Sequence, residues 1–148
     1  ASDRGERWSE DCLWLDVWTP AAHWDGQGTE PGPVLVWVVG RGLVGGAASD
    51  VCGAPYAAEH GVTFVSVQYR VGALGFLWPR GGDANCGLWD IVEALRWVQR
   101  EIRAFGGDPE RITAAGQGAG ADCLAWLCRA PPAHGLLDRA ILMSPGCL

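Results

Sequence analysis

Glycine occupies every second position of residues 116–120, which read Gly-Gln-Gly-Ala-Gly, and this feature limits the possible fold most. A short apolar segment, 111–115, comes before it, and residues 122–129 have a helical pattern. Glycine accepts backbone angles and close backbone contacts that a Cβ atom would forbid. The segment therefore predicts a strand, a sharp turn centred on Gly118, and a helix.

The composition predicts one modest globular domain. Of the 148 residues, 49% are hydrophobic and 19% are charged, which is typical of a chain that forms a core. The formal net charge is −6 and the basic residues form no run or stripe, which argues against a nucleic-acid partner. No apolar run reaches the roughly 18 residues that a membrane span needs.

Cysteine and glycine spacing give no sign of a bound group. The six cysteines include no C-x-x-C pair and no zinc-ligand spacing, so we expect no metal site. The glycine-rich residues 40–46 lack the G-K-[ST] ending of a phosphate-binding loop and do not fit G-x-G-x-x-G. We therefore expect no cofactor.

Apolar, β-branched runs alternate with helical patterns along the chain. Strands are expected at 12–19, 34–39, 62–69, 111–115 and 139–143, and helices at 49–60, 88–105 and 122–129. Residues 21–33 and 72–85 are interpreted as loops, and 108–110 as a capped single turn. This order predicts an α/β fold with a mainly parallel central sheet, right-handed crossovers and helices on both faces.

Several stretches, in the correct order, resemble the type-B carboxylesterases and cholinesterases, which have the α/β-hydrolase fold. Residues 10–20 resemble the family's E-D-C-L-Y-L-N-V-Y-T-P strand, residues 36–46 its V-W-I-H-G-G-G-F-x-x-G oxyanion loop, and residues 69–77 its Y-R-x-G-x-x-G-F-L segment. The match continues through 85–96 and 105–120. The resemblance implies a single partial type-B carboxylesterase domain at 1–148, truncated at both ends, which holds the N-terminal half of the sheet through the nucleophile elbow.

Gly118 stands where the family's G-x-S-x-G motif has its nucleophilic serine. Glycine has no side chain, so no acyl-enzyme can form at this position. Glycine also adopts the elbow backbone without the strain of about 1–3 kcal/mol that a serine would store there. The nucleophile slot is therefore expected to hold no catalytic residue.

The residues after Gly118 offer no complete triad. In this fold the acid and the histidine follow the nucleophile in the chain. The only acids after Gly118 are Asp122 and Asp138, and the only histidine is His134, which follows two prolines and is interpreted as a solvated loop residue. Cys123 lies too far along its helix, and too far around the helix axis, to replace the serine.

The resemblance places the donors of the oxyanion hole on the backbone amides of Arg41, Gly42 and Ala119. Arg41 replaces a glycine that lets the backbone come close to substrate, and Val39 replaces a polar family residue. We therefore expect the donors at their family positions, beside altered side chains.

Three further expectations come from the resemblance. Arg70 and Asp90 correspond to the partners of a buried structural ion pair, with two independent surface charges as the alternative. Cys12 corresponds to a cysteine that bonds to an upstream cysteine in the family, so we expect a free thiol here or a different partner. Because the family disulfide needs an oxidising compartment, we also expect an extracellular or secretory-pathway location.

Three functions remain open. The first is a catalytically inactive esterase-like domain for recognition or scaffolding of an unidentified protein partner, as in the neuroligins and other cholinesterase-like adhesion proteins. Residues 116–120 are similar to the neuroligin G-S-G-A-G, including the glycine in the nucleophile slot. The second is a segment of a serine carboxylesterase whose nucleophile is lost by substitution or by a sequence error. The third is a degenerate fragment without independent function.

Overall fold

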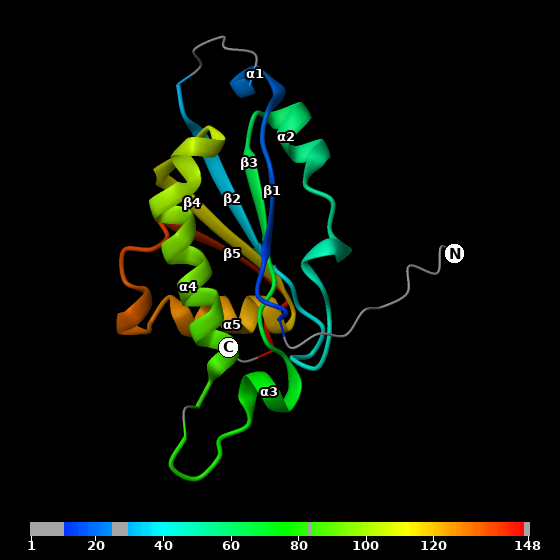
Figure 1. Ribbon diagram of the computed structural model, residues 1–148, viewed down its shortest axis with the longest axis vertical. Helices are drawn as coiled ribbons and strands as arrows, with labels where there is room; N and C mark the ends of the chain where they lie inside the picture. The colour runs from blue at the N-terminus through cyan, green and yellow to red at the C-terminus, as the bar shows by residue number, and fades with distance from the viewer. Residues whose placement is uncertain (1–10, 25–29, 83, 147–148) are drawn as a thin grey trace, which may run out of the picture.

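The computed structural model describes residues 11–24, 30–82 and 84–146, which form a five-stranded sheet in the order β1-β3-β2-β4-β5 (Figure 1). Strand β1 is antiparallel to β3, and all the other neighbours in the sheet are parallel. The strands are β1 (Leu15–Trp18), β2 (Gly32–Val38), β3 (Thr63–Val67), β4 (Gly107–Gln117) and β5 (Arg139–Met143). The predicted α/β class with a mainly parallel central sheet is confirmed.

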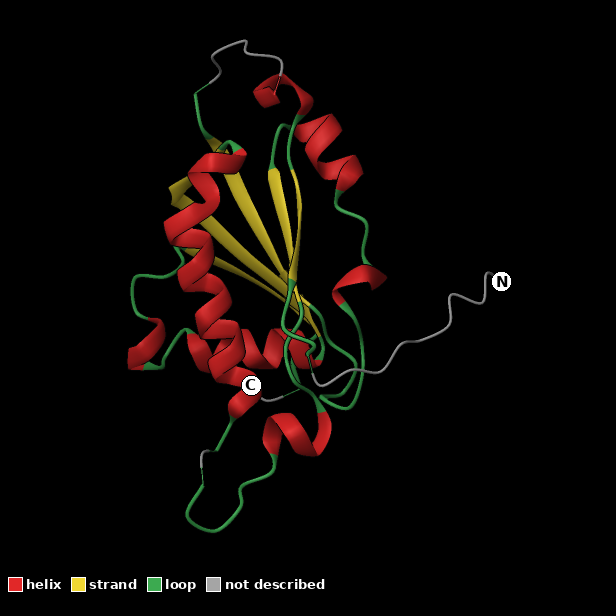
Figure 2. Ribbon diagram, in the orientation of Figure 1, coloured by secondary structure: helices red, strands yellow, loops and turns green. Residues whose placement is uncertain are grey.

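Helices connect the parallel strands and cover the sheet (Figure 2). The α-helices are α1 (Ala21–Trp24), α2 (Ala54–His60), α3 (Gly72–Phe76), α4 (Cys86–Glu101) and α5 (Ala119–Leu127). Single 3₁₀ turns lie at η1 (Ala48–Asp50), η2 (Ile102–Phe105) and η3 (Pro131–Ala133). Within the described residues, no helix is both long enough and apolar enough to cross a membrane.

Side chains of β3 alternate between two apolar layers, because successive residues of a strand point to opposite faces. Val65 and Val67 belong to the main core, which they share with apolar residues of α4 and α5. Phe64 lies on the other face, where its ring stacks on Tyr56 of α2 with 5.1 Å between ring centroids. Helices therefore lie on both faces of the sheet, as the strand and helix order predicts.

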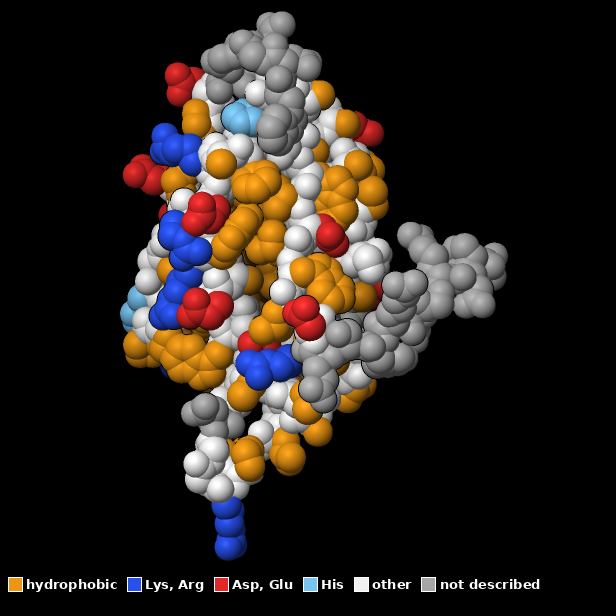
Figure 3. Space-filling view, viewed as in Figure 1, with side chains coloured by type: hydrophobic (Ala, Val, Ile, Leu, Met, Phe, Trp, Pro, Cys, Tyr) orange, Lys and Arg blue, Asp and Glu red, His pale blue; other side chains and the backbone are white. Residues whose placement is uncertain are grey.

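Helix α4 shows how the sequence pattern sets the packing. Its buried apolar residues recur at helical spacing and are Ile91, Val92, Leu95 and Val98, and charged residues lie between them. On the outer face, Arg96 pairs with Glu93, and charged side chains of both signs gather beside an apolar area in Figure 3. Gly106 follows η2 with a φ of 78° and ends the helical segment, as its position predicts.

The structure corrects three details of the predicted elements. The two segments interpreted as loops, 21–33 and 72–85, contain the short helices α1 and α3. The turn expected at 108–110 lies inside β4, which begins at Gly107. The pairing of β2 with β4 shifts there between Gly32 and Val34, and the amide of Glu110 donates to the Asp108 carboxylate. The local turn at 108–110 is thus an irregularity within β4, and the pairing of β4 with β2 resumes at Ile112.

Candidate functional site

Gly118 is the residue at which β4 becomes α5. Its φ of 53° and ψ of −121° lie outside the helical and extended regions that other residues favour. Its amide donates to the carbonyl oxygen of Met143 in β5 at 2.9 Å, and its own carbonyl oxygen accepts from the amide of Asp122 at 2.9 Å. The sharp turn predicted at Gly118 is therefore present and is fixed by both the neighbouring strand and the following helix.

The glycines on either side of Gly118 leave no room for a side chain. A Cβ atom at Gly116 would lie 2.6 Å from the carbonyl carbon of Gly120. A Cβ atom at Gly120 would collide with the carbonyl oxygen of Val38 in β2. These two glycines allow α5 to lie directly on the ends of β2 and β4, which sets the tight angle of the turn.

Gly118 itself is not required by packing. Apart from its two chain neighbours, a Cβ atom there would meet no described atom within 4 Å. A side chain at this position would therefore have space, although its backbone would be strained at a positive φ. The open space around the Cβ position means that steric contact does not exclude a side chain here.

The glycine-rich residues 40–46 come directly against the turn. A Cβ atom at Gly40 would collide with the carbonyl oxygen of Gln117 and would lie 3.2 Å from the amide nitrogen of Ala119. Among the described residues, no hydrogen bond occupies the amides of Arg41 and Gly42. Ala119 begins α5, so its amide has no acceptor within the helix. The three amides expected from the sequence thus belong to two adjoining segments and are available as donors.

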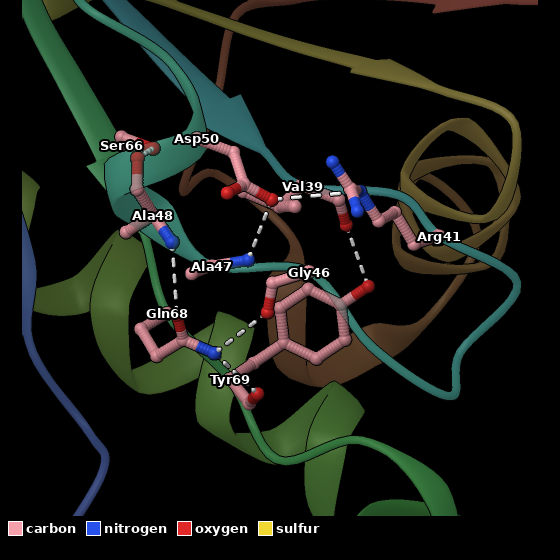
Figure 4. A network of polar contacts seen from close by, with 9 residues as sticks. All are labelled: Val39, Arg41, Gly46, Ala47, Ala48, Asp50, Ser66, Gln68 and Tyr69. Atoms are coloured by element: carbon pink, nitrogen blue, oxygen red, sulfur yellow. Dashed lines mark hydrogen bonds and ion pairs between the residues drawn. The ribbon is translucent and has the colours of Figure 1, made fainter. Parts of the chain in front are cut away.

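A polar network holds residues 39–50 in place (Figure 4). The hydroxyl of Tyr69 donates to the carbonyl oxygen of Val39 at 2.6 Å. The Gln68 side chain accepts from the amide of Ala48 at 2.8 Å, and the Ser66 hydroxyl donates to the carbonyl oxygen of Ala48 at 2.9 Å. Sequence reasoning missed this network, although Ser66 and Gln68 are polar residues within an apolar strand pattern.

Burial raises the pKa of Tyr69 well above its ordinary value, and the neighbouring Cys123 raises it further. Tyr69 is almost fully buried, and its hydroxyl lies where a phenolate would be desolvated beside the carbonyl oxygen of Val39. Tyr69 therefore stays protonated and keeps its hydrogen bond to the loop over the whole neutral range.

Arg41 directs its charge along its own loop. Its Nε lies 3.5 Å from a carboxylate oxygen of Asp50, and both side chains are well exposed. Asp50 also accepts from the amide of Ala47 at 3.1 Å. The stem of Arg41 packs beside Gly46, where an added Cβ atom would meet it at 3.5 Å. The guanidinium that replaces a family glycine thus helps to close the loop.

Arg70 and Asp90 form a bidentate ion pair at the end of β3. Arg70 donates to the carboxylate from Nε at 2.7 Å, from Nη2 at 2.6 Å and from its backbone amide at 3.0 Å. The hydrogen bonds to the carboxylate raise the pKa of the guanidinium above its usual range. The Asp90 side chain is 5% exposed, but the Arg70 side chain is 37% exposed. The buried charge of this pair is therefore the carboxylate, and the guanidinium is partly in water.

The remaining candidate residues lie apart from the turn. Cys12 is half-buried with its thiol outside any disulfide, and His134 is exposed after η3. Cys123 is buried in α5 beside Tyr69. Cys147, another possible partner of Cys12, lies outside the described residues. In the part of the chain that the structure describes, no group of three or more His, Cys, Asp or Glu residues is arranged to hold a metal ion.

Comparison with known proteins identifies the same family that the sequence motifs resemble. The sequence profile described as "Carboxylesterase family" matches residues 1–148. The chain is 49% identical to acetylcholinesterase of Gallus gallus over 142 residues, which cover 92% of this chain and 18% of that protein. It is 42% identical to fumonisin B1 esterase of Sphingopyxis macrogoltabida over an alignment of 151 residues, gaps included, that covers 93% of this chain and 26% of that protein.

A third relative is phenmedipham hydrolase of Pseudarthrobacter oxydans, which is 46% identical over 138 residues that cover 92% of this chain and 27% of that protein. The chain thus spans between 18% and 27% of the length of these three relatives. The family profile covers both the turn at Gly118 and the glycine-rich residues 40–46.

Proposed function

The chain belongs to the carboxylesterase family, and we propose that it is a segment of an esterase-like domain that has lost ester hydrolysis and serves recognition or scaffolding. We further propose that residues 1–148 are one partial domain of this type. By family resemblance the location would be extracellular or in the secretory pathway, and the partner would be a protein.

The observation that carries this proposal is Gly118 at the apex of the turn. The backbone has the conformation of an elbow between strand and helix, with a φ of 53° and a ψ of −121°. Acyl transfer by this family's route needs an oxygen nucleophile on that residue and a base that removes its proton. Gly118 has no side-chain atom, and a Cβ atom placed there would meet no described atom within 4 Å apart from its chain neighbours.

The residues around the elbow support the binding of a ligand without ester hydrolysis. The amides of Arg41, Gly42 and Ala119 are the proposed oxyanion donors, and the loop that carries the first two is held by Tyr69, Gln68 and Asp50. Preformed donors of this kind bind a carbonyl or carboxylate oxygen whether or not a nucleophile is present. Recognition of such a group would therefore survive the loss of hydrolysis.

A second candidate is a segment of a serine carboxylesterase whose nucleophile is lost by substitution or by a sequence error. Two observations favour it: the space above position 118 is open, and the curated relatives include proteins named as esterases and hydrolases. A third candidate, a degenerate fragment without function, requires that the chain does not fold, so cooperative unfolding of the 148-residue chain would remove it.

The test is turnover of a short-chain nitrophenyl ester by the parent chain, by Gly118→Ser and by the control Gly45→Ser. Gly45 lies in open space without a positive φ, so its variant adds a serine without altering the elbow. We expect all three rates to equal the buffer rate. Turnover by Gly118→Ser alone would favour the second candidate, and turnover by the parent chain would exclude the proposed loss of hydrolysis.

A further inference from the structure

Residues 78–82 form an exposed loop that follows α3 and extends from the lower end of the molecule in Figure 1. The Trp78 side chain is 74% exposed. The amide of Gly82 donates to the carbonyl oxygen of Pro79 at 3.1 Å, which is the one hydrogen bond that the described residues show in this loop. A Cβ atom at Gly81 would meet no described atom within 4 Å apart from its chain neighbours. The loop thus contacts mainly itself, so another protein can reach its backbone.

The elements on either side of this loop are fixed. Before it, Gly75 of α3 packs so closely on Arg70 that an added Cβ atom would collide with the Arg70 carbonyl oxygen. After it, Gly87 of α4 packs on Phe76, where an added Cβ atom would lie 2.7 Å from the ring. A backbone cut within residues 78–82 would therefore leave the packing of α3 against α4 in place.

The sequence of residues 77–82, Leu-Trp-Pro-Arg-Gly-Gly, suits an arginine-specific protease of the trypsin-like class. Such a protease binds the arginine side chain in an acidic pocket. Arg80 is exposed, and no described residue forms an ion pair with it. The ring of Pro79 fixes the backbone before the arginine and fits an apolar neighbouring pocket, and Gly81 has no side chain that would hinder attack.

We propose that the Arg80–Gly81 peptide bond is a processing site for a trypsin-like serine protease that accepts proline before arginine, and that the cut leaves two pieces that stay associated. The protease serine attacks the carbonyl carbon of Arg80, the carbon–nitrogen bond breaks, and Gly81 leaves as an amine with a proton from the protease histidine. Water then hydrolyses the acyl-enzyme: its hydroxyl joins the Arg80 carbonyl carbon, and its other proton returns to the protease serine. One water is consumed, and the protease is regenerated.

The bond between Arg41 and Gly42 joins the same two residue types but is held by the fold. The Arg41 carbonyl oxygen accepts from the amide of Val44 at 3.3 Å. Gly40, the preceding residue, packs against the backbone of the elbow. A protease binds its substrate as an extended segment, much as a sheet edge takes up an added strand. Cleavage after Arg41 therefore requires this segment to leave the elbow, whereas residues 78–82 are accessible in the folded chain.

The other arginines of the described residues lie in regular elements or are tied to one. Every basic residue of the chain is an arginine, so all of them are sites of the same chemical type. The amides of Arg70 and Arg129 are hydrogen-bonded to α4 and α5. The rest lie within α4, η2, β4 and β5, and are Arg96, Arg100, Arg103, Arg111 and Arg139. Cleavage at these positions requires local unfolding and is therefore slower.

The two pieces share one sheet and one core. Strand β2 lies before the cut and β4 after it, and these strands pair from Val34 opposite Ile112 to Val38 opposite Gly116. The ion pair of Arg70 with Asp90 also joins one piece to the other. The cut chain should therefore remain a single folded species.

The experiment treats the native 148-residue chain with limiting trypsin and, separately, with thrombin, a trypsin-like protease that prefers proline before arginine. Intact mass identifies the pieces. We expect both proteases to cut first after Arg80, at least about tenfold faster than after any other arginine of the described residues. Arg80→Gln should lose this cut, and the matched variant Arg129→Gln should keep it. Pro79→Ala should slow thrombin by at least about tenfold and leave the trypsin rate unchanged.

Two controls separate recognition of the sequence from access to the loop and from association of the pieces. Thrombin should cut a synthetic peptide of residues 74–84 as well as the native chain. A native chain that thrombin leaves intact, or that trypsin cuts first at another described arginine, would overturn the proposal. In gel filtration the cut chain should elute as one species in buffer and as two in urea, and separation of the pieces in buffer would also overturn it.

Discussion

The buried carboxylate of Asp90 accepts three hydrogen bonds from Arg70, two from the guanidinium and one from the backbone amide. Arg70 follows β3, and Asp90 lies in the second turn of α4, so the pair joins the sheet to its largest helix. The guanidinium is partly in water and the carboxylate is not. Loss of the guanidinium and loss of the carboxylate should therefore lower the free energy of unfolding by different amounts.

Arg70→Met should destabilise the chain by about 3 kcal/mol, because the buried carboxylate then keeps only the backbone hydrogen bond. Asp90→Asn should cost less, about 1–2 kcal/mol, because the partly exposed guanidinium can turn to water. Urea unfolding of both variants measures the difference. A larger loss for Asp90→Asn than for Arg70→Met would show that the burial of the two groups is wrongly assigned.

Gly40→Ala should lower the free energy of unfolding by about 3 kcal/mol, since the added methyl group would collide with backbone atoms of Gln117 and Gly120. Backbone atoms cannot rotate away as a flexible side chain could. The matched control is Gly45→Ala in the same loop, where a methyl group meets nothing within 4 Å. Equal urea midpoints for the two variants would contradict the close contact between the loop and the elbow.

Gly118→Ala should cost about 1–3 kcal/mol for a different reason, because the strain at a φ of 53° remains even where space is available. Gly45→Ala again serves as the reference for a glycine replacement without strain. The difference between the urea midpoints of the two variants measures the destabilisation caused by backbone strain at position 118. Equal urea midpoints for Gly118→Ala and Gly45→Ala would mean that the backbone at the elbow relaxes when a side chain is present.

Tyr69→Phe should destabilise the chain by about 1–2 kcal/mol at neutral pH, because the buried carbonyl oxygen of Val39 loses its donor. The pH dependence gives a second readout. The pKa of Tyr69 is raised in the folded chain, so above pH about 10 the unfolded chain loses the phenol proton while the folded chain keeps it. The free energy of unfolding contributed by this group is therefore fully present below that pH and falls as pH rises.

The measurement compares the parent chain with Tyr69→Phe in urea at neutral pH and at several values above pH about 10. The gap between them should narrow as pH rises, because only the parent has the Tyr69 phenol to titrate. A gap that stays constant or widens would show that Tyr69 is not the buried, protonated group that holds the loop.

Local pattern was enough for the largest elements. The spacing of apolar residues predicted a helix at 88–105, and the structure has α4 followed by η2 over nearly the same residues. The continuous apolar runs predicted β2 and β3, which are buried between two layers of helices. These features depend on residues a few positions apart, so a single sequence contains them.

Contacts between distant residues could not be predicted in the same way. Helix α3 was missed because Gly72 and Gly75 disfavour a helix locally, whereas in the fold Gly75 packs closely on the backbone of Arg70. Tyr69 bonds to a carbonyl 30 residues away, and no spacing rule connects them. The elbow at Gly118 was predictable because its strand, glycines and helix are consecutive, but its open surroundings were visible only in the structure.

The central claim is that the elbow at Gly118 carries no nucleophile, and intact-protein mass after incubation with a fluorophosphonate tests it most directly. The probe forms a covalent adduct with an activated serine, so a working serine esterase serves as the positive control. The parent chain should keep its unmodified mass under conditions that label the control completely. One adduct per chain, mapped to any serine of the folded parent, would contradict the loss of ester hydrolysis.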